Sequence, residues 1–200
     1  MLAVYVTHPQ VEMNPEVPVP DWGLSALGRA RAEALAARPW VRRLARVVTS
    51  TERKAREAGA ILARAAGVAP EAWPDLHEND RGATGYLAPE EFERAADAFF
   101  AHPGQSFRGW ETADAAQARV VRAVRAALAG HPPDRPVAIV GHGAVGTLLW
   151  LALSGRPISR AADQPPGGGN LFAFPLPEGR PLSGWVPMEA WDGVALAPES

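Results

Sequence analysis

The chain has 200 residues, and 47% of them are hydrophobic. That proportion supports a substantial buried core and excludes a chain that is disordered over most of its length. The formal net charge of −2 excludes a general nucleic-acid-binding protein, which would carry a basic excess. Because cysteine is absent, disulfides, cysteine nucleophiles and thiolate metal sites are excluded as well.

The length suits one domain and no linker divides it, so we expect a single domain over residues 1–200. The N-terminus lacks a basic segment, and the apolar run from Leu2 to Val6 is too short for a signal peptide. No stretch approaches the roughly 20 apolar residues of a membrane span. We therefore expect a cytoplasmic protein that binds neither nucleic acid nor membranes.

The chain begins with a predicted strand that leads to a histidine. Leu2 to Val6 is an apolar, β-branched run of strand character, and Pro9 cannot continue a central strand. His8 is thus expected at the carboxyl end of this strand. Because ligands of open α/β sheets bind beyond the carboxyl ends of the strands, His8 is a candidate site residue.

The rest of the chain alternates predicted strands with predicted helices. A proline-spaced loop containing Asn14 precedes the first helix, and Ser25 is the expected N-cap of that helix. Hydroxyl groups of residues 49–51 are expected to cap the second helix. The predicted helices cover about residues 24–38, 51–66, 89–100, 112–129 and 144–153. The predicted strands cover residues 2–6, 45–50, 136–140, 170–174 and 184–186, the last two as a hairpin.

The second predicted helix places two neighbouring basic residues on different faces. Arg53 lies on the solvent side, where Glu57 is spaced for an i,i+4 ion pair. Lys54 lies at the edge of the core face and can reach over the end of the preceding strand. It is the only lysine among the 20 basic residues. The core stripe itself consists of Ala55, Ala58, Leu62 and Ala65.

A second histidine turn resembles the first one. An apolar run over residues 136–140 is followed by His142 between two glycines and then by a helix. If the two strands are neighbours, His8 and His142 face each other across one crevice. Strands that alternate with helices imply a mainly parallel sheet between helical layers. We therefore expect an α/β fold, a three-layer α/β/α sandwich with a mainly parallel mixed sheet.

The polar groups at these turns suit an anionic ligand. Helix N-termini favour anions, and histidines with Lys54 beside such termini predict a phosphate site. An imidazole can act there as a covalent nucleophile, and a carboxylic acid is needed to protonate the leaving group. The candidates for this acid are Asp75, Glu78 and Asp80. A zinc site formed by His8, His142 and Glu78 is a weaker interpretation, because no close His-x-x-x-His pair exists.

These motifs together resemble the histidine phosphatase superfamily, the phosphoglycerate mutase-like group. The resemblance covers roughly residues 2–150. It depends on the order of several short motifs rather than on any one of them. In this chain they are His8, Asn14, Leu24-Ser-Ala-Leu-Gly28, the Thr49-Ser50 turn with a basic residue, Leu76-His-Glu78 with Gly82, and Gly141-His-Gly143.

The resemblance implies a role for each matching residue. His8 would be the nucleophile that becomes phosphohistidine, His142 would bind and polarise the phosphoryl group, and Glu78 would be the general acid. Asn14 would hold a phosphate oxygen, and Lys54 aligns with a phosphate-binding arginine of the family. The implied fold is phosphoglycerate mutase-like, the implied partner is a small phosphorylated substrate, and no metal or other cofactor is implied.

Two positions depart from the family pattern. The family has Arg-His-Gly at the nucleophile, whereas this chain has Thr7-His8-Pro9, so one phosphate-binding arginine is missing and Thr7 offers only a hydroxyl. Lys54 binds phosphate as a point charge and not through a planar fork. We expect Lys54 to be the main fixed positive charge, with Arg81 or Arg108 as loop residues that could compensate.

The expected function is hydrolysis of a small phosphomonoester through phosphohistidine on His8. The alternative is a catalytically weakened or inactive family member that binds a phosphorylated or anionic ligand. Loops 73–110 and 156–169 are expected to select the substrate. The sequence leaves open which substrate this is, and whether two copies of the chain form a homodimer.

Overall fold

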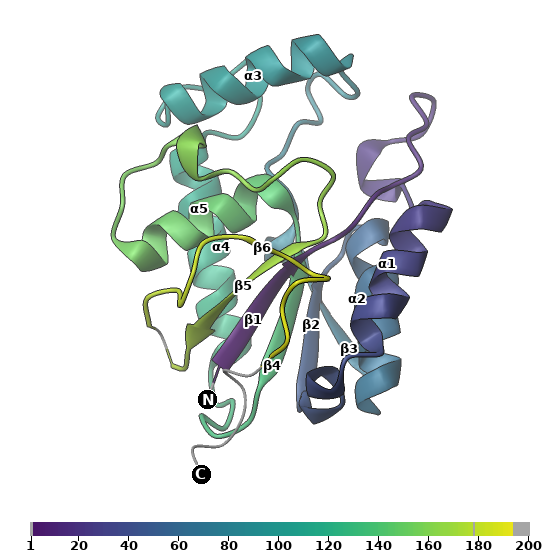
Figure 1. The fold of residues 1–200 in the computed structure, drawn as a ribbon. Coiled ribbons are helices and arrows are strands. Elements are labelled where there is room, and N and C mark those ends of the chain that lie inside the picture. The colour runs from purple at the N-terminus through teal and green to yellow at the C-terminus, as the bar shows by residue number, and fades with distance from the viewer. Residues whose placement is uncertain (1, 178, 194–200) are drawn as a thin grey trace.

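The computed structural model of the chain describes residues 2–177 and 179–193. Its strands form one six-stranded sheet in the order β3-β2-β4-β1-β5-β6 (Figure 1). The four strands from β3 to β1 are parallel neighbours, whereas β5 is antiparallel to β1, and β6 is antiparallel to β5. The mainly parallel mixed sheet is thus confirmed. The strands are β1 Leu2–Thr7, β2 Arg46–Ser50, β3 Pro70–Trp73, β4 Val137–Gly141, β5 Asn170–Pro175 and β6 Val186–Pro187.

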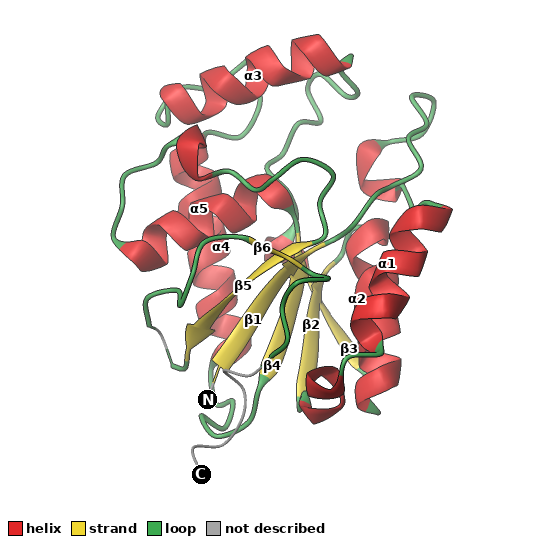
Figure 2. Ribbon diagram, in the orientation of Figure 1, coloured by secondary structure: helices red, strands yellow, loops and turns green. Residues whose placement is uncertain are grey.

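The helices form the two outer layers of the expected sandwich (Figure 2). Helices α1 and α2 pack on one face of the sheet, and α4 and α5 pack on the other. Helix α3 stands beyond the carboxyl ends of the parallel strands. Among the described residues, none of the helices combines the length and the hydrophobicity that a membrane span requires. The helices are α1 Ala26–Ala36, α2 Arg53–Ala66, α3 Pro89–Ala101, α4 Ala113–Leu128 and α5 Gly143–Ser154, with short 3-10 turns at Val19–Asp21, Pro39–Arg43, Pro74–Leu76 and Arg160–Ala162.

Strand β1 is buried on both of its faces, which explains its continuous apolar run. Successive side chains of a strand point to opposite faces of the sheet. Val4 and Val6 accordingly join the core against α1 and α2, whereas Ala3 and Tyr5 join the core against α4 and α5. A strand buried in this way belongs at the centre of a parallel sheet, and its carboxyl end therefore opens onto the middle of the sheet edge.

The start of α1 forms as predicted, but the start of α2 does not. Ser25 is the N-cap of α1, and its side chain accepts a hydrogen bond from the N–H of Gly28 at 3.1 Å. The predicted hydroxyl cap of α2 is wrong, since Glu52 occupies the N-cap position and makes no capping bond. The Ser50 hydroxyl instead accepts the N–H of Glu52 at 3.1 Å. As a result, the Glu52 side chain is available for contacts in the site.

Strand β3 was not predicted from the sequence, whereas the hairpin of β5 and β6 was. Strand β3 has only four residues, contains a proline and a glutamate, and forms the edge of the sheet beside β2. Such a segment lacks the alternating apolar pattern of a strand, because its pairing depends on the neighbouring strand rather than on its own burial. The expected late hairpin is confirmed, with β6 antiparallel to β5.

Candidate active site

The two histidine turns lie side by side because β1 and β4 are adjacent and parallel. Thr7 is in register with Gly141, so His8 and His142 follow at the same edge of the sheet. The N–H of His8 donates to the carbonyl of Gly141 at 3.0 Å. The two imidazole rings meet edge to face, with their centroids 5.3 Å apart. The structure thus places the two rings in contact at one edge of the sheet, as expected from the sequence. Of the two, His8 lines a cavity there, whereas His142 is completely buried and does not.

The hydrogen bonding of His8 determines which of its nitrogens is free. Its Nδ1 lies 2.8 Å from the carbonyl oxygen of Pro9. A carbonyl can only accept, so Nδ1 carries the hydrogen and Nε2 keeps its lone pair. Burial lowers the pKa of His8 to about 4, and although the bond to Pro9 opposes this shift, the charges of Lys54 and Arg81 add to it. His8 therefore presents a neutral imidazole with a free Nε2 at neutral pH.

His142 is completely buried, and Tyr5 and Ser50 hold it in place. The Tyr5 hydroxyl accepts the N–H of His142 at 3.0 Å and donates to the His142 carbonyl at 3.1 Å. The side chain of His142 contacts the Ser50 hydroxyl through Nε2 at 2.7 Å, whereas Nδ1 has no hydrogen-bond partner within the described residues. Burial lowers the pKa of His142 to about 3, more than the neighbouring carboxylates Glu52 and Glu78 raise it.

The close approach of Tyr5 to this turn explains one of the glycines beside His142. A Cβ added to Gly141 would lie 2.3 Å from the Tyr5 hydroxyl. Any other residue at position 141 would therefore push Tyr5 away from the backbone of His142. Burial raises the pKa of Tyr5, so its hydroxyl keeps the hydrogen that it donates to the His142 carbonyl.

Glu78 is the one of the three acidic candidates that faces the histidines. Its carboxylate accepts the N–H groups of Ala144 at 3.2 Å and Val145 at 3.0 Å, in the first turn of α5. It thus satisfies free N–H groups at the start of the helix that follows His142. Asp75 and Asp80 are exposed, and neither lines the cavity that contains His8 and Glu78.

A buried arginine on α4 holds the backbone around Glu78. The guanidinium of Arg119 donates to the carbonyls of Asp75, His77 and Glu78 at 2.8, 3.0 and 3.2 Å. It also forms an ion pair with Glu111 at 2.7 Å. These bonds fix three carbonyls of the loop, so they position the Glu78 side chain against α5.

Glu52 and Lys54 form a buried ion pair behind His142. Only 8% of Glu52 and 3% of Lys54 is exposed, and the Lys54 ammonium also donates to the Val19 carbonyl at 2.9 Å. The other oxygen of Glu52 accepts the N–H of Glu78 at 2.8 Å and lies 3.6 Å from Nε2 of His142. Burial opposes ionisation of Glu52, but His142 and Lys54 outweigh it and lower the Glu52 pKa to about 2.

Arg53 lies on the outer side of the same helix, as predicted. It forms the expected i,i+4 ion pair with Glu57 at 2.8 Å, and its side chain is 63% exposed. The amphipathic pattern therefore distinguished the two neighbouring basic residues correctly. It could not indicate that Glu52 neutralises the charge of Lys54, because residues two apart do not face each other on a helix, and the pair forms only because α2 begins at Arg53.

The cavity that His8 lines, which we call the catalytic cavity, has a volume of about 400 Å³. Gly143 and Ala144, which follow His142, line it, but His142 itself does not. Helix α3 forms its roof, with Phe92 and Phe99 among the lining side chains. Arg160 joins this roof to the loop over residues 156–169 through ion pairs with Glu93 and Asp97. The polar side of the cavity contains His8, Glu78, Asn79, Arg81, Asp163 and Gln164.

Arg81 is the arginine that faces this cavity without a carboxylate partner in the described part of the chain. Its guanidinium lies 5.0 Å from the centroid of the Phe92 ring and 5.8 Å from that of Trp110. Arg108, the other arginine considered from the sequence, forms an ion pair with Glu91 and does not line the cavity. Arg81 is therefore the loop arginine placed to meet an anion beside His8.

Asn14 and Thr7 do not line the catalytic cavity. The Asn14 side chain is exposed and accepts the N–H of Glu16 at 3.0 Å. The buried Thr7 hydroxyl donates to Gln164 at 2.8 Å and accepts the N–H of Asn170 at 3.0 Å. Within the described residues, no group of three His, Asp or Glu side chains is arranged to hold a metal ion. The zinc interpretation therefore has no geometric support.

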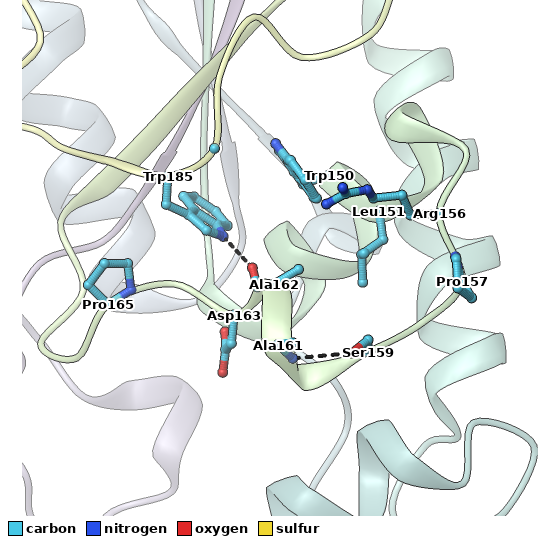
Figure 3. A pocket seen from close by; sticks show the side chains of 11 residues that line it. Trp150, Leu151, Arg156, Pro157, Ser159, Ala161, Ala162, Asp163, Pro165 and Trp185 are labelled. Atoms are coloured by element: carbon cyan, nitrogen blue, oxygen red, sulfur yellow. Dashed lines mark hydrogen bonds between the residues drawn. The ribbon is translucent and has the colours of Figure 1, made fainter.

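A second cavity, of about 520 Å³, lies on another side of the loop over residues 156–169 (Figure 3). The Trp185 indole donates to the carbonyl of Ala162 at 3.1 Å, and Arg156 lies over the Trp150 ring at 5.4 Å. Asp163 is among the residues that line both this space and the catalytic cavity.

Several residues that build the site were missed in the sequence. Tyr5 is hidden in the apolar run of β1, and Arg119 is one of three arginines on α4. Glu52 stands beside the hydroxyl groups of residues 49–51, which are the expected caps, and so it carries no local signal of its own. Position 119 shares a helix face with the apolar Ala116 and Ala123, at i−3 and i+4. A charged residue within such a buried stripe is the one signal that could have indicated Arg119.

Solved structures with this fold include several bacterial proteins. One is mycobacterial glucosyl-3-phosphoglycerate phosphatase in complex with inorganic phosphate. It is 22% identical over 95% of this chain and 99% of that one, with a TM-score of 0.78. Bacillus stearothermophilus YhfR is 24% identical over 90% of this chain and 93% of that one, with a TM-score of 0.76. TTHB049 from Thermus thermophilus is 27% identical over 93% of this chain and 99% of that one, with a TM-score of 0.65.

No curated protein matches the chain. The sequence profile of the histidine phosphatase superfamily (branch 1) matches residues 4–171. The matched range contains both histidine turns, the Glu52–Lys54 turn and the Glu78 loop, and it covers most of the chain. The chain therefore belongs to the histidine phosphatase superfamily, branch 1.

Proposed function

We propose that the chain hydrolyses a small phosphomonoester through a phosphohistidine intermediate on His8. The observation that carries the proposal is the contact between the rings of His8 and His142, 5.3 Å apart at the carboxyl edge of the sheet. The bond from Nδ1 of His8 to Pro9 supports it further, because this bond leaves Nε2 free to attack. Phosphatase activity in the mycobacterial neighbour is in line with this reaction class.

The reaction has two steps that exchange one proton with Glu78. In the first, the Nε2 lone pair of His8 attacks phosphorus, the bond from phosphorus to the ester oxygen breaks, and the Glu78 carboxyl protonates the leaving oxygen. In the second, water attacks the phosphohistidine and gives its proton back to the Glu78 carboxylate. The bond from phosphorus to Nε2 then breaks, which releases phosphate and restores neutral His8.

His142 is suited to bind the phosphoryl group as a neutral hydrogen-bond donor. The Ser50 hydroxyl accepts the N–H of Glu52 and can still donate its own hydrogen to Nε2 of His142. In the tautomer that this donation requires, the ring hydrogen of His142 lies on Nδ1, the nitrogen without a partner in the described residues. Donors that are fixed before the reaction stabilise the charge that develops in the transition state.

Two observations favour the alternative of a weakened or inactive phosphate-binding protein. The Thr7 hydroxyl is already bonded to Gln164 and Asn170, so it does not replace the missing arginine. Glu52 neutralises Lys54 inside the protein. Arg81 therefore becomes the main cation of the cavity wall, and phosphoryl transfer depends strongly on such charge stabilisation.

Turnover of an aryl phosphate by wild type, His8→Ala and His102→Ala tests the proposal. His102 is exposed and does not line the catalytic cavity, so His102→Ala is a matched control. We expect His8→Ala to abolish turnover and His102→Ala to retain it. Turnover that survives in His8→Ala would contradict the proposal. An inert wild type that still binds vanadate would establish the alternative.

A further inference from the structure

A smaller cavity adjoins the catalytic cavity and has a different character. We call it the apolar cavity; its volume is about 240 Å³. It lies between the loop that follows β1 and the segment that leads into α3, two parts of the chain that are far apart in sequence. It is lined by Met13, Val19, Trp22, Arg81, Gly85, Tyr86, Leu87, Pro89, Phe92 and Glu93.

Large hydrophobic side chains at this cavity remain exposed to solvent. Met13 is 64% exposed and Tyr86 is 37% exposed, and they are two of the four exposed large hydrophobic residues in the described part of the chain. The rings of Trp22 and Tyr86 lie 5.8 Å apart and form one wall. Exposed apolar side chains that converge around a concavity are typical of a ligand-binding surface.

The apolar cavity shares part of its wall with the catalytic cavity. Arg81, Phe92 and Glu93 line both spaces. The Arg81 guanidinium, which lies over the Phe92 ring, is therefore at the junction between them. Glu93 is held by its ion pair with Arg160. A molecule with its phosphate on His8 and Arg81 could place its organic group among Met13, Trp22 and Tyr86.

The larger cavity in Figure 3 shares a different part of the wall of the catalytic cavity. Asp163 and Pro165 are the two residues that it shares with the catalytic cavity. Its own arginine, Arg156, lies over Trp150 and does not line the catalytic cavity. The apolar cavity is thus the one that offers a cation at its junction with the catalytic cavity.

We propose that the apolar cavity binds the organic group of the phosphate ester, and that this group is a hydrophobic ring. The proposal rests on the proposed function, since it names the substrate class of the same site. A cavity of about 150 Å³ lined by apolar side chains can hold benzene. The volume of the apolar cavity therefore suits one ring with short substituents. Its charged lining residues are Arg81 at the junction and Glu93 in its ion pair, which do not suit a highly polar sugar.

Calorimetric binding of two phosphonates, which cannot be hydrolysed, tests this inference without turnover. Phenylphosphonate carries one ring, and methylphosphonate carries almost no organic group. Burial of an aromatic side chain contributes about 1.5–3 kcal/mol, so we expect wild type to bind phenylphosphonate about ten- to a hundredfold more tightly. The variant Met13→Ser/Tyr86→Ser should lose most of this ratio and bind methylphosphonate unchanged. The control Leu182→Ser, which removes an exposed hydrophobic residue outside the apolar cavity, should keep the ratio.

The outcomes separate this inference from the proposed function. Equal affinity of wild type for both phosphonates would overturn the inference, even if the protein hydrolyses aryl phosphates. An equal loss of both affinities in the double variant would overturn it as well, because the cavity would then not distinguish the organic group. A clear preference for phenylphosphonate in a protein without turnover would support the ring site and contradict only the hydrolytic function.

Discussion

Replacing the buried pair Glu52 and Lys54 one residue at a time is expected to be far more damaging than replacing both. In Glu52→Gln the ammonium of Lys54 keeps only the Val19 carbonyl as its observed partner. In Lys54→Met the carboxylate of Glu52 remains buried beside His142, with the N–H of Glu78 as its partner. Each single variant therefore leaves one uncompensated charge in the core.

The expected losses of unfolding free energy follow from the burial of the pair. Breaking a buried pair by removing one partner typically destabilises a protein by about 3–5 kcal/mol, whereas replacing both by neutral residues is often near neutral. We therefore expect losses of about 3–5 kcal/mol for Glu52→Gln and for Lys54→Met. The double variant should lose much less than the sum of the two.

A double-mutant cycle by urea unfolding measures this coupling. Arg53→Met is the matched control, because Arg53 is the neighbouring residue on the same helix and its pair with Glu57 is exposed. It should change the free energy of unfolding by at most about 1 kcal/mol. Losses that add up within about 0.5 kcal/mol would refute the buried pair. Single variants that fail to fold beside a double variant that folds would establish it.

Acid also probes the Glu52 carboxylate. Its pKa is lowered from the ordinary 4.5 to about 2, so between these values the unfolded chain binds more protons than the folded one. The stability that this group contributes is complete above about pH 4.5 and is lost as the pH falls toward 2. Each pKa unit corresponds to about 1.4 kcal/mol, which gives about 3 kcal/mol in total. Urea unfolding at about pH 5 and about pH 3 measures how much unfolding free energy is lost between the two. This loss should be smaller in the double variant than in wild type, because the double variant has no carboxylate at position 52.

Arg81→Gln should weaken vanadate binding about ten- to a hundredfold in calorimetry, because a hydrogen bond to a charged group contributes about 1.5–3 kcal/mol. Arg108→Gln, whose partner is Glu91, is the control, and equal losses would contradict the assignment. Because burial lowers the pKa of His8 to about 4, the acid limb of kcat/KM should lie near pH 4, and a limb near the ordinary 6.5 would be inconsistent with this environment. Glu78→Gln should slow esters with poor leaving groups about 10²–10⁴-fold but aryl phosphates far less. Equal slowing would mean that another group is the acid.

The parts of the fold that could be predicted are those whose pattern is local. The apolar runs of β1 and β4 identify buried strands by themselves, and the residue after each run is then placed at the sheet edge. Strand β3 has no such pattern, because an exposed edge strand of four residues is specified by β2 and not by its own composition. The same reasoning separates Arg53 from Lys54, which depends only on helical periodicity.

The parts of the site that could not be predicted depend on contacts between distant segments. Tyr5 reaches His142 across 137 residues of sequence, and Arg119 reaches the Glu78 loop across 41. Glu52 is close to Lys54 in sequence, but its pairing becomes visible only when the turn is folded beside His142. Asn14 is the opposite case. The resemblance assigns it a site role, but the folded chain places it in an exposed loop.

The charges around the cavity bear on where the affinity for a phosphate ester would originate in the proposed function. The charge of Lys54 is balanced by Glu52, and that of Arg160 is balanced by Glu93 and Asp97. In the proposed reaction, a phosphate on His8 would therefore be met mainly by Arg81, the arginine of the cavity wall without a carboxylate partner in the described part of the chain. With fewer fixed cations than the family pattern supplies, we expect phosphate alone to be held less strongly. Binding energy from the organic part of the ester can then position the phosphoryl group for attack. A ring in the apolar cavity beside Arg81 would supply that energy next to the reacting atoms.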